Sequence, residues 1–169
     1  MTAEPIFTLR EAIPTDAPHV LRLVRGLADY EKLLHEVVAT EADFHAAFSG
    51  PTPPAHAFLA AYPHQPPVGL ALWHYTFSTF TGRADIFLED LFVEPAHRGK
   101  GLGLALLRRL AQRAVADRCR RIEWKVLNWN KPSIAFYQSV GAVPMQDWHV
   151  RQLAGSALAA LATGASKHG

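Results

Sequence analysis

Residues 98–103 read Arg-Gly-Lys-Gly-Leu-Gly, and this glycine-rich stretch separates a predicted strand from a predicted helix. The N-terminus of a helix presents backbone N–H groups without intrahelical partners, together with the positive end of the helix dipole. Glycines let an anionic group approach the backbone closely, because they carry no side chain. The stretch is therefore predicted to bind phosphate groups.

Two better-known phosphate-binding motifs do not fit this stretch. The dinucleotide fingerprint needs a third glycine where this chain has Leu104, and the nucleotide P-loop needs Ser or Thr after Gly-Lys, where this chain has Gly101. A flexible connector that happens to be glycine-rich is the other alternative. The coincidence of strand, arginine, spaced glycines and helix argues against it.

The residues before the glycine-rich stretch contain both helical and extended patterns. Residues 6–10 predict a short strand, Pro14-Thr15-Asp16 predicts the start of a helix, and Thr40 is placed to cap a second helix. Three strands then follow, and the short breaks between them predict an antiparallel meander. These strands are expected over residues 55–62, 68–78 and 84–93.

The residues after the stretch continue the alternation of helix and strand. Leu102 to Arg118 has helical periodicity, and residues 121–127 predict a strand. Asn130 is placed to cap a helix that ends at Gly141, and a last strand is expected over residues 148–153. The predicted fold class is therefore mixed α/β, with a central, mostly antiparallel sheet flanked by helices.

Length and composition favour one globular domain over residues 1–154. The chain has 169 residues, of which 49% are hydrophobic, and a net charge of +2 that points to no particular partner. Residues 155–169 are rich in Ala, Gly and Ser, so this tail is expected to be one loose helical turn or disordered.

Several classes of protein are disfavoured by the same sequence. The single cysteine, Cys119, cannot form an internal disulfide, and the nine histidines lack the paired spacing of a metal site. Residues 1–10 lack a long apolar run, so a soluble, cytoplasmic protein without membrane contact is expected. Nucleic-acid binding is not expected, because the arginines are scattered around a helix without stacking aromatics. These arginines are Arg108, Arg109, Arg113, Arg118, Arg120 and Arg121.

Arg98, Gly101 and Gly103 fit the pattern Arg-x-x-Gly-x-Gly, which resembles the acetyl-coenzyme A pyrophosphate loop of the GNAT superfamily. A closer likeness is to the diamine acetyltransferases, which acetylate spermidine, spermine and thialysine, and it spans nearly the whole chain. Three segments carry it: Leu-Ala-Asp-Tyr-Glu at residues 27–31, Leu-Glu-Asp-Leu-Phe-Val at 88–93, and Trp-Asn-Lys-Pro-Ser-Ile-Ala-Phe-Tyr at 129–137. The resemblance implies a GNAT fold, a homodimer, and acetyl transfer from acetyl-CoA to a primary amine of a small polyamine-like or lysine-like substrate.

The resemblance also implies residue roles. Tyr137 would be the general acid, and Glu89 would be the base that accepts the amine proton directly or through water. Tyr30, Glu31, Glu89 and Asp90 would line the amine site. The backbone of Leu91, Phe92 and Val93 would pair with the pantetheine arm. The remaining coenzyme contacts would be Arg98, Gly99, Lys100, Gly101, Leu102, Gly103, Asn130 and Ser133.

The chemistry of acetyl transfer needs such a base, because an alkyl ammonium has a pKa of about 10.4 and must lose a proton before it attacks. Cys119 has no evident base nearby, which favours direct transfer over an acyl-enzyme. The alternative for Glu89 and Asp90 is a solvated strand end, and for Tyr137 it is a core tyrosine.

Two departures from the family pattern bear on the substrate. Phe80 stands where an indole is familiar, and the shorter segment after Gly141 makes Asp147 and Trp148 only approximate matches. A peptide or protein N-acetyltransferase and a non-catalytic acetyl-CoA binding module are the alternative functions. The presence of both a base and an acid candidate argues against the binding module.

Overall fold

The structure is a computed structural model that describes residues 7–164, and the chain divides into two compact units after Lys125. Within the described residues, no helix is both long enough and apolar enough to cross a membrane.

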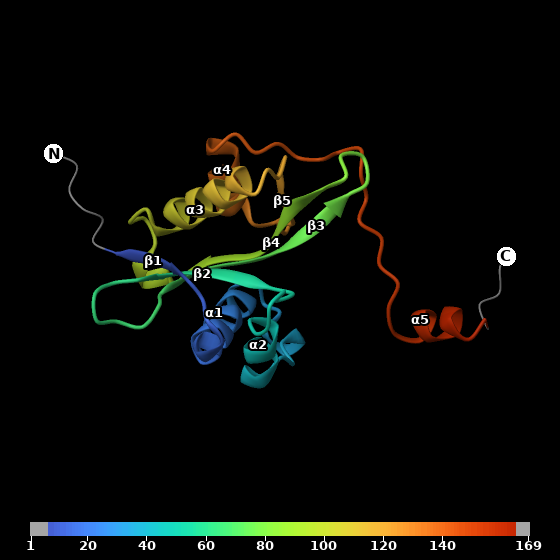
Figure 1. The fold of residues 1–169 in the computed structure, drawn as a ribbon, viewed down its shortest axis with the longest axis horizontal. Coiled ribbons are helices and arrows are strands. Elements are labelled where there is room, and N and C mark those ends of the chain that lie inside the picture. The colour runs from blue at the N-terminus through green and yellow to red at the C-terminus, as the bar shows by residue number, and fades with distance from the viewer. Residues whose placement is uncertain (1–6, 165–169) are drawn as a thin grey trace. The chain divides into compact units, whose positions relative to one another are not determined.

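The first unit contains a five-stranded sheet in the order β1-β2-β3-β4-β5. Neighbouring strands from β1 to β4 run antiparallel, and β5 runs parallel to β4 (Figure 1). The predicted mixed, mostly antiparallel sheet and its meander are confirmed. The strands are β1 (Thr8–Glu11), β2 (His56–Ala61), β3 (Gly69–Ser78), β4 (Arg83–Val93) and β5 (Ile122–Trp124). The fifth strand is shorter than the predicted 121–127, because it pairs with only three residues of β4.

Helices cover both faces of this sheet. In Figure 1, α1 and α2 lie on one face and α3 on the other. The α-helices are α1 (Ala17–Tyr30), α2 (Glu41–Ala47) and α3 (Leu102–Ala116), and the 3₁₀ turns are η1 (Pro14–Asp16), η2 (Leu34–Glu36) and η3 (Pro95–His97). Thr40 caps α2 as predicted, because its hydroxyl accepts the N–H of Asp43 while the Asp43 carboxylate accepts the N–H of Thr40.

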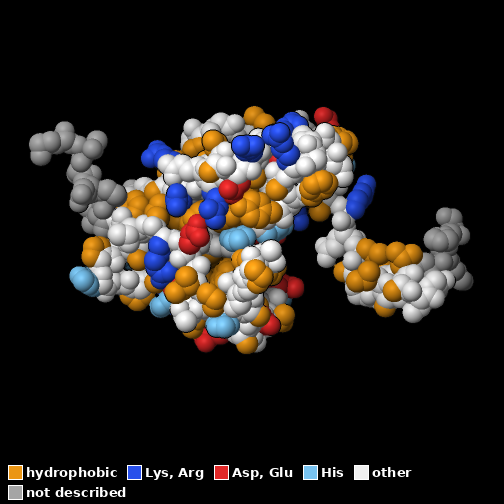
Figure 2. Space-filling view, in the orientation of Figure 1, with side chains coloured by type: hydrophobic (Ala, Val, Ile, Leu, Met, Phe, Trp, Pro, Cys, Tyr) orange, Lys and Arg blue, Asp and Glu red, His pale blue; other side chains and the backbone are white. Residues whose placement is uncertain are grey.

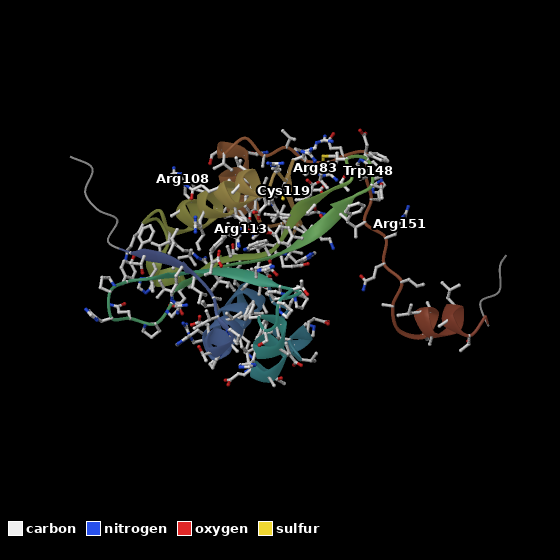
Figure 3. All side chains as sticks on the ribbon, in the orientation of Figure 1. Arg83, Arg108, Arg113, Cys119, Trp148 and Arg151 are labelled. Atoms are coloured by element: carbon white, nitrogen blue, oxygen red, sulfur yellow. The ribbon has the colours of Figure 1, made fainter. Side chains whose placement is uncertain are left out.

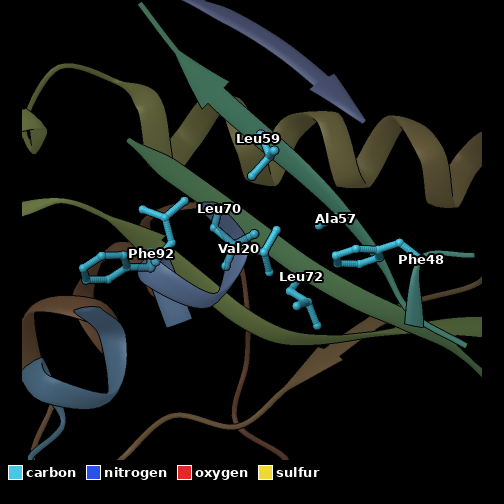
Figure 4. Packing of buried hydrophobic residues seen from close by; sticks show 8 residues of the cluster. Val20, Phe48, Ala57, Leu59, Leu70, Leu72 and Phe92 are labelled. Atoms are coloured by element: carbon cyan, nitrogen blue, oxygen red, sulfur yellow. The ribbon is translucent and has the colours of Figure 1, made fainter. Parts of the chain in front are cut away.

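The apolar stripes of the helices form the core. Val20 and Leu23 of α1 pack against Leu59, Leu70 and Phe92 of the strands, together with further residues seen in Figure 4. On the opposite face, the buried residues of α3 recur at helical spacing and are Leu102, Leu106 and Leu110.

A buried carboxylate positions β5. Asp85 of β4 is only 2% exposed, and it accepts hydrogen bonds from the backbone N–H of Arg120 and from Nε of Arg121, both at 2.9 Å. A buried charge is tolerated only when it is paired and hydrogen-bonded, so these contacts fix the start of β5 beside β4. The sequence did not single out Asp85.

The second unit contains α4 (Lys131–Ser139) and α5 (Gly155–Ala162). The Asn130 side chain accepts the N–H of Ser133, which confirms the predicted cap, and Gly141 follows the helix with a φ of 87°. The strand predicted over residues 148–153 is wrong, since these residues form no regular element. An apolar and polar alternation predicts a strand only where a partner strand satisfies its backbone, and no described strand pairs with this segment.

The C-terminal tail contains more helix than its sequence predicts. It was expected to hold at most one loose helical turn, but α5 is a helix of 8 residues. The Ala-rich and Leu-containing composition of this segment favours helix intrinsically, which explains the extra length. The boundary of the catalytic domain after residue 154 stays a prediction.

Candidate active site

A β-bulge in β4 decides where its acidic residues point. Leu72 of β3 is opposite Asp90, whereas the next residue, Trp73, is opposite Leu88, so Glu89 is an extra residue in β4. In a regular strand, Glu89 and Asp90 would point to opposite faces of the sheet. The bulge interrupts this alternation.

The consequence is that both carboxylates share the face covered by α1. Asp90 is paired with Leu72, a member of the core cluster under α1. Oε1 of Glu89 lies 2.9 Å from Nε2 of His74, which is two residues beyond Leu72 and therefore on the same face of β3. The side chain of Glu89 is about half exposed, at 49%.

Asp90 interacts electrostatically with Glu89 and with Glu31, the residue at the end of α1. Burial, together with the negative charges of Glu89 and Glu31, raises the pKa of Asp90 to about 6. Glu31 is the residue that caps the C-terminus of α1, and burial raises its pKa as well. Three of the predicted amine-site residues therefore interact with one another, and Tyr30 directly precedes Glu31 at the end of the helix.

His74, which no sequence pattern singled out, belongs to this group of side chains. Its ring stacks on Phe87 of β4 with 5.5 Å between ring centroids, and its Nδ1 lies 3.1 Å from the carbonyl oxygen of Tyr75. The period of β3 could have placed His74 on the same face as Leu72. Its contact with Glu89, however, depends on the bulge, which has no local sequence signal.

Two glycines of the glycine-rich loop have a left-handed backbone conformation. Gly99 and Gly101 have φ values of 73° and 84°, which side chains disfavour, and α3 begins directly after Gly101. The first helical hydrogen bond runs from the N–H of Ala105 to the carbonyl of Gly101. The N–H groups of Leu102, Gly103 and Leu104 therefore have no partner within the helix. Lys100 points back and donates to the carbonyl of Ala96 at 3.3 Å.

Arg98 joins the loop to two other predicted site segments. Its Nε donates to the carbonyl of Val93 at 2.9 Å, where β4 ends. Its guanidinium lies 4.8 Å from the ring centroid of Tyr30 and 5.6 Å from that of Phe92. A predicted coenzyme residue thus contacts a predicted amine-site residue.

The end of β4 has one edge without a strand partner among the described residues. β5 pairs only with Ile86, Phe87 and Leu88 of β4. Beyond the bulge, the segment from Leu91 to Val93 pairs with β3 on one side, and no described strand continues along its other side. Such an edge offers backbone groups to an extended ligand.

The other predicted site residues lie in the second unit, on one short helix. Asn130 is buried and caps α4 through the N–H of Ser133, and Tyr137 follows Ser133 by one helical turn. The Tyr137 ring contacts that of Phe136 with 5.4 Å between centroids. The roles of Asn130, Ser133 and Tyr137 stay predictions.

Arg109, Arg113 and Arg121, in and after α3, engage neighbouring groups in the first unit. Arg113 pairs with Glu11 at 3.2 Å and with Asp117 at 3.3 Å, and the guanidinium of Arg109 lies over the Phe58 ring. Figure 2 accordingly shows basic and acidic side chains interspersed over α3 rather than a single basic patch. This pattern fits a solvated, charge-paired surface.

Cys119, labelled in Figure 3, follows the end of α3. It is half-buried, and burial together with the charges of Asp117 and Asp85 raises the pKa of its thiol. A raised thiol pKa disfavours the nucleophilic thiolate. That Cys119 is no nucleophile stays a prediction, which the raised thiol pKa favours.

Comparisons with known proteins show the family to which the chain belongs. The model of the acetyltransferase (GNAT) family matches residues 24–142, and the chain belongs to this family. It is 35% identical over 164 residues to a thialysine N-epsilon-acetyltransferase of Bos taurus, covering 91% of this chain and 96% of that protein. The chain is thus an N-acetyltransferase.

A second relative and a solved structure extend the likeness. The chain is 27% identical to an L-ornithine N5-acetyltransferase of Arabidopsis thaliana, over 90% of this chain and 86% of that one. An integron cassette protein from the mobile metagenome of V. cholerae superposes with a TM-score of 0.77 at 24% identity, covering 93% and 98% of the two chains. This structural match supports the fold.

Proposed function

We propose that this N-acetyltransferase moves an acetyl group from acetyl-CoA directly to a primary amine of a small cationic substrate, polyamine-like or lysine-like. The observation that carries the proposal is the bulge that puts Glu89 and Asp90 on one face, within electrostatic range of Glu31. Clustered carboxylates attract a cationic amine. The relatives named for thialysine and ornithine, whose acceptor groups are side-chain amines, support the lysine-like class.

The proposed donor fits the residues that are present. Acetyl-CoA supplies the acetyl group as an activated thioester. The N–H groups at the start of α3, with Arg98 and the left-handed glycines, suit its pyrophosphate. The backbone of Leu91 to Val93 has an edge suited to the pantetheine arm. Asn130 and Ser133 are proposed to contact the coenzyme as well.

The proposed catalytic residues handle two protons. Glu89 is about half exposed, so it can accept the proton of an incoming ammonium ion directly or through water. Tyr137 is proposed to donate a proton to the departing thiolate. Because Cys119 has a raised thiol pKa, no residue of α3 or its flank supports a covalent acyl-enzyme step.

We further propose that the enzyme is a cytoplasmic homodimer. The family resemblance supports the dimer, and Phe77 and Phe80, near the turn between β3 and β4, are 69% and 93% exposed and are the residues that we propose an interface covers. Sedimentation velocity at assay concentrations tests the assembly. A monomer at every concentration would contradict it.

The experiment that tests the reaction is a coenzyme-release assay across diamines, polyamines, thialysine, lysine and short peptides. We expect release with the small cationic amines, and acetylated amine as the product detected by mass spectrometry. Turnover with peptides alone would overturn the small-substrate proposal. A preference for thialysine over every polyamine would mean that the acids do not jointly face the distal end of the substrate, because they repel its carboxylate.

A further inference from the structure

The histidine beside the proposed base has both ring nitrogens against hydrogen-bond acceptors. Nδ1 of His74 lies 3.1 Å from the carbonyl oxygen of Tyr75, and Nε2 lies 2.9 Å from Oε1 of Glu89. A carbonyl oxygen can only accept a hydrogen bond, so Nδ1 must carry a hydrogen.

That assignment limits the states of the pair. If the ring is neutral, Nε2 holds a lone pair that faces Glu89, and an ionised Glu89 faces it with another lone pair. Two acceptors at 2.9 Å form a stable contact only when one proton lies between them. The contact at 2.9 Å therefore represents the pair with this proton bound. The state that accepts a proton from the substrate is the pair without it, in which the two lone pairs are opposed.

We propose that His74 is the group that takes up the amine proton, with Glu89 passing it on. In this step the N–H bond of the substrate ammonium breaks, and its electron pair stays on nitrogen as the nucleophile. The proton reaches the Glu89 carboxylate and then forms the N–H bond at Nε2 of His74. The imidazolium that results is paired with the carboxylate. The inference rests on the proposed role of Glu89 as the base.

The environment of His74 allows the proton to leave again. Its side chain is 32% exposed, so water can receive the proton after the transfer. Charged groups near the pair come from β4 and from β5 with the residue that follows it. Asp90 adjoins Glu89, Glu123 is paired with Phe87, and the ammonium of Lys125 lies 5.7 Å from the Phe87 ring on which His74 stacks.

His74→Gln separates proton uptake from hydrogen bonding. The glutamine amide can still donate to Glu89 but cannot take up a proton. We expect kcat to fall by about tenfold to a hundredfold with the KM for the amine little changed. The pH profile of kcat should also lose one ionisation on its acid side. His56→Gln is the matched control, because His56 lies on β2 and stacks on Trp73, which points to the other face of the sheet.

The outcomes distinguish this inference from the role of Glu89. An unaltered kcat and pH profile in His74→Gln, beside an impaired Glu89→Gln, would overturn the inference and leave Glu89 as the base. A lower kcat with the ionisation retained would mean that His74 only positions Glu89, which also overturns it. Full activity in Glu89→Gln would overturn both proposals. Thermal unfolding of each variant checks that the fold is kept.

Discussion

The guanidinium of Arg98 lies 4.8 Å from the ring centroid of Tyr30, so the glycine-rich loop contacts the last residue of α1. Arg98 also donates to the carbonyl of Val93, at the end of the strand that carries Glu89 and Asp90. The residues proposed for the coenzyme and for the amine are thereby in contact. A change at Tyr30 should therefore affect both substrates.

Tyr30→Leu should weaken coenzyme binding by about twofold to fivefold, because a cation–π contact of this kind is worth about 0.5–1 kcal/mol. Tyr30→Phe keeps the aromatic face and should retain the affinity. Calorimetric titration with coenzyme A measures both variants. Equal affinities in the leucine and phenylalanine variants would show that the ring does not support Arg98.

Gly101→Val should abolish the stabilisation of the folded protein by acetyl-CoA. The φ of 84° at this position costs a β-branched residue about 1–2 kcal/mol. A backbone change that relieves this strain would distort the phosphate-binding turn and so weaken the stabilisation by acetyl-CoA. Gly82→Val is the matched control, since Gly82 has a φ of 64° in the turn before β4, with no atom within 4 Å of an added Cβ. Differential scanning fluorimetry should show that both variants lose stability while only Gly82→Val keeps the coenzyme-induced shift. Loss of the shift in both would contradict a specific role for Gly101.

Asp90→Asn should change the pH dependence of stability. Burial and the charges of Glu89 and Glu31 raise the pKa of Asp90 to about 6 from 3.8, so the folded protein holds this proton more tightly than the unfolded chain. Asp90 therefore contributes stability that is fully present below its ordinary pKa and is lost as the pH rises through about 6.

The asparagine variant should consequently match wild type near pH 4 and exceed its free energy of unfolding near pH 8, by about 1 kcal/mol after allowance for solvent screening. Urea unfolding at the two pH values measures this difference. The variant Asp29→Asn, an exposed acid on α1, serves as the control and should not reproduce it. An equal change at both pH values would mean that Asp90 does not titrate in this range.

Tyr137→Phe should lower kcat by about a hundredfold or more, the usual effect of losing a general acid, while coenzyme affinity stays close to wild type. Tyr62→Phe removes a hydroxyl that is buried without a hydrogen-bond partner among the described residues, and it should leave kcat unchanged. Steady-state kinetics with one amine compares the two. Wild-type turnover in Tyr137→Phe would end its assignment as the acid.

Features with local signals could be predicted from the sequence. The start of α3 at Leu102 follows from the glycines and the apolar periodicity within one or two helical turns of it. The caps at Thr40 and Asn130 likewise depend on side chains three residues from the groups they bind. The resemblance supplied the acidic residues, but their common face could not be deduced from alternation.

Features that depend on pairing between distant segments could not be predicted. The bulge at Glu89 is a property of the register between β3 and β4, and the sequence of either strand alone does not predict it. The contact of His74 with Glu89 follows from that register. The strand wrongly expected over residues 148–153 shows the same limit, because alternation does not create a partner strand.

The most direct test of the acidic cluster measures kcat/KM for cadaverine and for pentylamine, which have the same carbon chain but differ in their second amine. If Glu31, Glu89 and Asp90 act together on a cationic substrate, the diamine should have the higher value. Glu31→Gln and added salt should both reduce that difference. Equal values for the two amines, unchanged in Glu31→Gln, would contradict the account.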